Sequence, residues 1–87
     1  MKVIAIKGYN YIQLFYKDTK KRLASLTTGF IHDSEYNEFD NTLIKIEIDL
    51  NEDLYNTALN FHKIQDSVIK NIFIETIKNL MNESYSS

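Results

Sequence analysis

The chain contains no cysteine, proline or tryptophan, and glycine occurs only at positions 8 and 29. The absence of cysteine excludes disulfides, thiolate nucleophiles and cysteine-based zinc sites. Two isolated glycines cannot form a glycine-rich loop around phosphate groups. No apolar run approaches the roughly 18 residues of a membrane span, and the stretch after Met1 is too short for the apolar core of a secretory signal. We therefore expect a soluble cytoplasmic protein without membrane contact, located in the host cytoplasm if it is viral.

Residue patterns typical of catalysis are missing as well. The two histidines, His32 and His62, lie thirty residues apart, so no paired-histidine zinc motif can be written. The serines lack the flanking glycines of a nucleophile elbow. Glu47 and Asp49 have the spacing of a glycosidase carboxylate pair, but the strand face expected to carry them is open and polar, without the pocket that such chemistry needs. The sequence predicts a non-enzymatic protein without cofactor or metal; an enzyme subunit or metal-dependent accessory factor is a third hypothesis.

The length of 87 residues and the mass of 10.2 kDa fit one domain. We expect an α+β fold: an antiparallel β-sheet of about four strands with one or two C-terminal α-helices packed on one face. Residues 1–50 are the predicted sheet region, residues 51–82 the helical region and residues 83–87 a frayed tail. Alternating apolar and polar side chains place the strands at residues 3–6, 11–16, 23–28 and 44–50.

The helical region begins at Asn51, a good N-cap that is followed by two carboxylates in the first turn. One continuous helix over 52–81 would measure about 45 Å, much longer than strands of about 20 Å. A break over 62–67 is therefore expected, with Asp66 or Ser67 capping a second helix. Because no glycine or proline enforces the break, a single helix remains the alternative.

A helical wheel drawn through both halves of this region predicts which side chains are buried. One broad apolar arc is expected to face the sheet. Its members are Leu54, Ala58, Phe61, Val68, Ile69, Ile72, Phe73 and Leu80. Ile64, Ile74 and Met81 fall outside the arc, so they are expected to be exposed singly or to pack against a second copy, forming a homodimer through the C-terminal helical region.

Charge is sorted along the chain, although the net charge is only −2. Residues 1–31 carry six bases and one acid, a charge of +5, whereas residues 32–53 carry eight acids and one base, a charge of −7. Residues 54–87 are balanced, with three of each. In a chain without an evident reactive group, this separation is the strongest indication of function.

The acidic stretch 32–41 has neither strand nor helix periodicity and is predicted to be a loop with interleaved aromatic residues. Such a loop fits a partner with a basic surface, for example a host protein with a nucleic-acid-binding groove. The alternatives are a solvated loop that balances the basic hairpin and, more weakly, a calcium loop, which lacks the glycine and closing glutamate of an EF-hand. The predicted contact residues are Asp33, Glu35, Tyr36, Glu38 and Asp40, extended along the last strand by Glu47 and Asp49.

A basic cluster at the predicted hairpin tip supports an alternative partner. Phosphate groups and bases of a single strand would be bound by lysines and by the aromatic residues of the adjacent strands. The predicted nucleic-acid-binding residues are Lys17, Lys20, Lys21 and Arg22. A pI near 5.6 argues against this partner, and lysines at a turn also serve solubility and protect a sheet edge.

Residue usage indicates an origin. Twelve isoleucines, nine asparagines and nine lysines against one arginine are the residues that AT-rich codons favour. A low-GC bacterium, its phage or an archaeal virus would show this bias. We therefore expect a small protein that binds and inhibits a host macromolecule through its acidic and aromatic surface, like the anti-defence (anti-CRISPR-like) inhibitors that phages and mobile elements encode. The alternative is a nucleic-acid-binding accessory protein that uses the basic hairpin.

Overall fold

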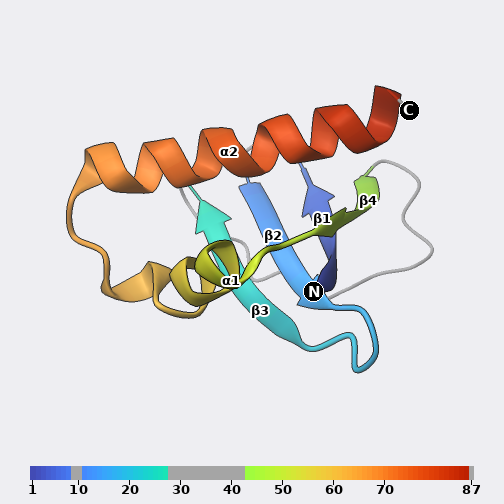
Figure 1. Ribbon diagram of the computed structural model, residues 1–87, viewed down its shortest axis with the longest axis horizontal. Coiled ribbons are helices and arrows are strands. Elements are labelled where there is room, and N and C mark those ends of the chain that lie inside the picture. The colour runs from blue at the N-terminus through green and yellow to red at the C-terminus, as the bar shows by residue number, and fades with distance from the viewer. Residues whose placement is uncertain (9–10, 28–42, 87) are drawn as a thin grey trace.

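The computed structural model describes residues 1–8, 11–27 and 43–86. Four strands precede the helices in the chain (Figure 1). The elements are β1 (Lys2–Lys7), β2 (Tyr11–Tyr16), β3 (Arg22–Thr27), β4 (Ile44–Asp49), α1 (Glu52–Leu59), the 3-10 turn η1 (Phe61–Lys63) and α2 (Ser67–Ser86). The predicted α+β class is confirmed: a four-stranded antiparallel sheet with two helices.

The strand order is β3-β2-β1-β4, and all neighbours are antiparallel. Strand β1 is therefore central and pairs with the last strand as well as with its neighbour in sequence. Val3 lies opposite Ile48 on one side and opposite Tyr16 on the other. A bulge interrupts the pairing of β2 with β3, because Leu14 pairs with Ala24 but Phe15 pairs with Arg22. Leu23 is the extra residue.

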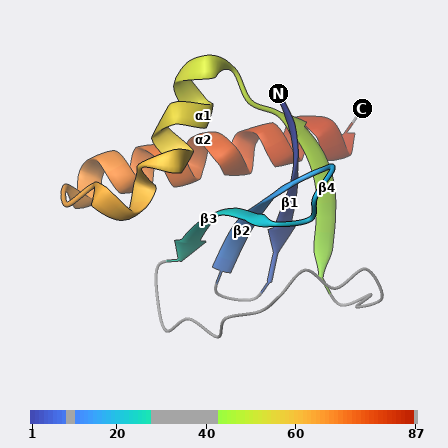
Figure 2. The same cartoon turned by 90° about the horizontal axis from the view of Figure 1, so that it is seen from below.

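One face of the sheet forms the core with both helices, and α2 runs across the strands on that face (Figures 1 and 2). Alternation along β1 explains why Val3 and Ala5, which are fully buried, point to the same side. The strands contribute Val3, Ala5, Ile12, Leu14, Ala24, Leu26 and Ile48 to this core, and Leu50 follows β4. The helices and the turn contribute Ala58, Phe61, Phe73, Ile74, Ile77 and Met81.

The opposite face of the sheet is also buried at its centre. Ile6, Gln13 and Phe15 are each no more than 2% exposed, although they alternate with the residues of the helix-facing core. This face opens to water where Lys2 on β1 and Glu47 and Asp49 on β4 are exposed. The open, polar face expected at Glu47 and Asp49 is therefore present on β4, whereas the middle of the sheet is buried on both faces.

The helical region divides where the sequence predicted. Asn51 caps α1, since its Oδ1 accepts a hydrogen bond of 2.8 Å from the backbone N–H of Leu54. Asp66 caps α2, accepting from the N–H groups of Val68 at 2.9 Å and Ile69 at 3.4 Å. Helix α2 continues to Ser86, beyond residue 82, where the sequence placed the end of the helical region.

The predicted buried face of α2 is confirmed at Phe73, which is in the core, and at Leu80, which packs against it, but it is wrong at five other positions. Ile74 and Met81, expected to be exposed, are each 5% exposed, whereas Val68, Ile69 and Ile72, expected in the core, are 63%, 50% and 61% exposed. The helical wheel treated residues 52–81 as one helix. Because the chain is not α-helical between α1 and α2, the side of α2 that faces the sheet is not fixed by the buried side of α1. Within α2 the buried positions 73, 74, 77 and 81 recur at helical spacing, and Val68 lies on the side opposite the central one of these, Ile77.

The observed orientation of α2 predicts a large effect of one truncation in this helix and a negligible effect of another. Replacing Ile77, which is fully buried, by alanine should lower the free energy of unfolding by about 2–5 kcal/mol because it leaves a cavity. Replacing the exposed Val68 by alanine should change it by less than about 0.5 kcal/mol. Urea denaturation of both variants measures the difference in the free energy of unfolding. Comparable losses in the two variants would contradict the burial of Ile77 and the exposure of Val68.

Candidate functional site

The acidic residues of β4 are paired with cations from the beginning of the chain. Glu47 lies 2.6 Å from the Lys17 ammonium and 3.9 Å from that of Lys2. Asp49 lies 2.9 Å from the amino group of Met1, which also donates to the Leu50 carbonyl at 2.8 Å. These contacts follow from the pairing of β1 with β4, which places the first residues beside the last strand. The part of the predicted contact surface on β4 is thus balanced within the molecule.

The ion pairs also set the acidity of these groups. A hydrogen bond from Lys17 holds the pKa of Glu47 below its ordinary value, and the nearby ammonium charges act in the same direction. The amino group of Met1 lowers the pKa of Asp49 in the same way. Conversely, Glu47 raises the pKa of Lys17. All of these groups are at the surface, so their ion pairs contribute little to stability.

The other predicted contact residues lie outside the described residues. These are Asp33, Glu35, Tyr36, Glu38 and Asp40. The described ranges carry ten bases and eight acids, a charge of +2. Segment 28–42 contains four acids and no base. The negative net charge of the chain therefore originates in this segment, and its role in binding stays a prediction.

The basic hairpin is only partly available for a ligand. Lys17 is engaged by Glu47, and Lys20 adopts a φ of 61° in the turn, where its N–H donates to the Tyr16 carbonyl at 3.0 Å. The aromatic residues beside it do not form an open stacking surface. Phe15 is buried, and the Tyr16 hydroxyl lies 3.0 Å from that of Tyr55 on α1, with the two rings edge to face. This arrangement weakens the nucleic-acid alternative.

The outer side of α2 is an apolar surface that sequence reasoning missed. We call it the α2 outer face; it is formed by Val68, Asn71, Ile72, Glu75, Thr76 and Asn79, which line a shallow groove. Val68 and Ile72 are the two most exposed large apolar side chains among the described residues. The sequence signal was present, because Val68, Ile72 and Thr76 are four residues apart, but the wheel assigned Val68 and Ile72 to the core.

Neither a metal site nor a membrane-spanning helix is found in the part of the chain that the structure describes. Residues 1–8, 11–27 and 43–86 contain no group of three side chains placed to hold a metal ion. Neither helix in these ranges has the length and apolar character needed to cross a membrane. Comparison of the chain with protein-family models, with curated proteins and with solved structures finds no match.

The ion pair on β4 predicts a change in titration. Replacing Lys17 by methionine should raise the pKa of Glu47 toward its ordinary value of 4.5, because the hydrogen bond that favours the carboxylate is lost. Since the folded-state pKa is lowered, the contribution of the pair to stability is present above pH 4.5 and is lost as the pH falls through the folded-state value.

Carboxyl chemical shifts followed by NMR against pH provide the measurement. Asp49 is the internal control, because its partner is the amino group of Met1 and its pKa should not follow the substitution of Lys17. An unchanged Glu47 titration in the Lys17→Met variant would contradict the pairing.

Proposed function

We propose that this chain is a small non-enzymatic protein that binds a partner protein through the α2 outer face and acts by covering the partner's surface. The observation that carries the proposal is the exposure of Val68 and Ile72 in the α2 outer face, together with that of Ile69 beside it on the first half of α2. The core does not need these side chains, since α2 already packs on the sheet through Phe73, Ile74, Ile77 and Met81. A group of large apolar residues that is not used for folding is typical of an interaction site.

Covering the exposed apolar side chains of α2 supplies a modest free energy of binding. Fully burying a valine or isoleucine side chain is worth about 1.5–3 kcal/mol, so covering three half-exposed ones supplies a few kcal/mol. That amount can dominate a small interface, where a few central apolar side chains carry most of the affinity. One helix face offers far fewer than the roughly 20–30 residues a side that stable interfaces use, so binding through this face alone would be weak for any partner, a second copy included.

The shape of the α2 outer face fits a helix. Positions 68, 72 and 76 form one row along α2 and positions 71, 75 and 79 form the next, with the groove between them. Helices pack by placing such a row of one helix into the groove of the other. We therefore infer that the partner supplies an amphipathic helix whose apolar stripe contacts Val68 and Ile72.

The charge of the partner is inferred from two independent features. Glu75 borders the groove with 66% of its side chain exposed and only a loose contact of 3.4 Å with Lys78. Segment 28–42 contributes four further acids without a base. Both features favour a partner whose contact surface is basic, as complementary potentials speed association and select partners. The acids Asp33, Glu35, Glu38 and Asp40, with Tyr36, remain the second part of the proposed contact surface.

The biological setting that we propose is inhibition of a host macromolecule by a protein of phage or mobile-element origin. Small size, AT-rich residue usage and a binding mode that occludes a surface are the support for this setting. The protein would then act in the host cytoplasm. Identification of the partner decides this part of the proposal.

A photo-reactive amino acid at position 72 tests the contact surface. The expected result is a cross-linked adduct with a partner protein in cells of a low-GC host, and no such adduct from position 56 on the exposed side of α1. The partner is then purified and its dissociation constant measured. An adduct consisting only of two copies of this chain would overturn the inference of a different partner protein.

Substitution of Ile72 by lysine should weaken binding of the purified partner at least tenfold, about 1.4 kcal/mol, because it places a charge in the apolar contact opposite a basic helix. Leu59→Lys is the matched control, since Leu59 is also an exposed apolar helix residue but lies on α1, and it should leave the affinity within twofold. Equal effects of the two substitutions, or none, would remove the α2 outer face from the interface.

Replacing Asp33, Glu35, Glu38 and Asp40 together by serine tests the acidic segment. We expect weaker binding by roughly a few kcal/mol at low salt, a smaller loss at high salt where the attraction is already screened, and little change in stability. Isothermal titration at two salt concentrations measures both. An unchanged affinity in a folded variant would discard the segment as a contact surface.

A further inference from the structure

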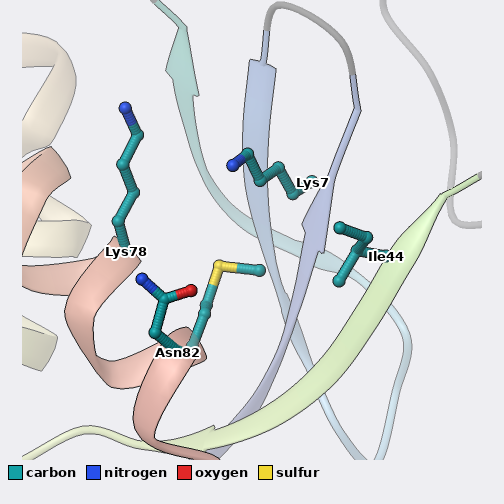
Figure 3. A pocket seen from close by; sticks show the side chains of 5 residues that line it. Lys7, Ile44, Lys78 and Asn82 are labelled. Carbon is teal, nitrogen blue, oxygen red and sulfur yellow. The ribbon is translucent and has the colours of Figure 1, made fainter. Parts of the chain in front are cut away.

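A separate pocket lies between the C-terminal half of α2 and the adjoining ends of β1 and β4 (Figure 3). Its volume is about 290 Å³, and its described lining is Lys7, Ile44, Lys78, Met81 and Asn82. Lys7 and Ile44 are register partners at the end of the β1–β4 ladder. The three α2 residues recur at spacings of three and four, so they project from one side of the helix.

The position of Lys7 follows from strand alternation. Val3 and Ala5 point into the core under the helices, so the next residue of that row, Lys7, is directed to the same side. Figure 3 shows its side chain extending from β1 toward α2, where Lys78 and Asn82 project from the helix. Two ammonium groups from different elements thus border one pocket, together with a carboxamide that can donate hydrogen bonds.

The pocket combines this positive rim with apolar walls. Met81 is 5% exposed and Ile44 is 47% exposed, so one wall is part of the core and the other is open to a ligand. Among the described residues the pocket has no acidic lining, and no described carboxylate pairs with Lys7. Among residues 1–8, 11–27 and 43–86, the anion that pairs with Lys78 is Glu75, at 3.4 Å and largely in water. An entering anion would therefore not displace a buried ion pair.

We propose that this pocket binds a small organic anion, with its carboxylate held by Lys7, Lys78 and Asn82 and its hydrocarbon part against Ile44 and Met81. A few converging polar groups on an otherwise apolar lining are typical of small-molecule sites. The volume of about 290 Å³ is just below the usual range of about 300–1,000 Å³, so the ligand is small. This site is distinct from the α2 outer face, with which its described lining shares no residue.

Octanoate is the probe, because it combines a carboxylate with an apolar chain. In ¹H–¹⁵N NMR titrations of the full chain, octanoate should produce saturable shifts centred on residues 7, 44, 78 and 82. Acetate lacks the apolar part and octanol lacks the charge, so each should bind at least tenfold more weakly. Octanol binding as tightly as octanoate would overturn the role of the lysines.

Charge removal completes the test. The Lys7→Met, Lys78→Met double variant should bind octanoate at least tenfold more weakly while its spectrum stays folded, since both side chains are at the surface. The matched control is Lys63→Met, Lys45→Met, which removes the same charge away from the pocket lining and should bind within twofold of the wild type. Equal losses in both variants would indicate a general charge effect and overturn the site, as would wild-type affinity in the Lys7, Lys78 variant. Ile44→Ser should weaken octanoate binding without changing that of acetate.

Discussion

The antiparallel pairing of β1 with β4 is the constraint on which the rest of the structure depends. It joins residues about forty positions apart, from Lys7 with Ile44 to Lys2 with Asp49, places the first strand in the middle of the sheet, and delivers the chain to Asn51, where α1 begins. The same pairing brings Lys2 and Lys17 to Glu47, so part of the charge separation in the sequence is cancelled in space. Because Lys7 and Ile44 end this ladder, it also builds one wall of the anion pocket.

Local features of the fold could be predicted because local physics sets them. Period-two alternation located the four strands to within about two residues, and Asn51 and Asp66 have the side chains that cap helices. The rotation of α2 could not be obtained in this way. Val68 and Ile72 are as apolar as Ile77, so only the contact with the sheet decides which row is buried. A break of a few residues between two helices is sufficient to change which side of the second helix faces the sheet.

The candidate sites illustrate a second limit. The acids of β4 looked available in the sequence, but their partners come from the beginning of the chain, and only the sheet register shows that they meet. The α2 outer face was hidden by the wrong helical phase. The pocket combines Lys7, Ile44 and Lys78 from three distant parts of the chain, none of which belongs to a motif. Candidate sites of this kind depend on how the fold brings distant residues together more than on the spacing of residues in the sequence.

The bulge at Leu23 and the charges of β4 have a further consequence, because β3 and β4 are the two outer strands of the described sheet. The bulge makes the ladder of β3 irregular, and Lys45, Glu47 and Asp49 put an ionic group at every second position of β4. Neither border therefore offers the flat, uncharged template on which strands of other molecules add. The borders of the described sheet are in this way protected against edge-to-edge addition of strands from other molecules.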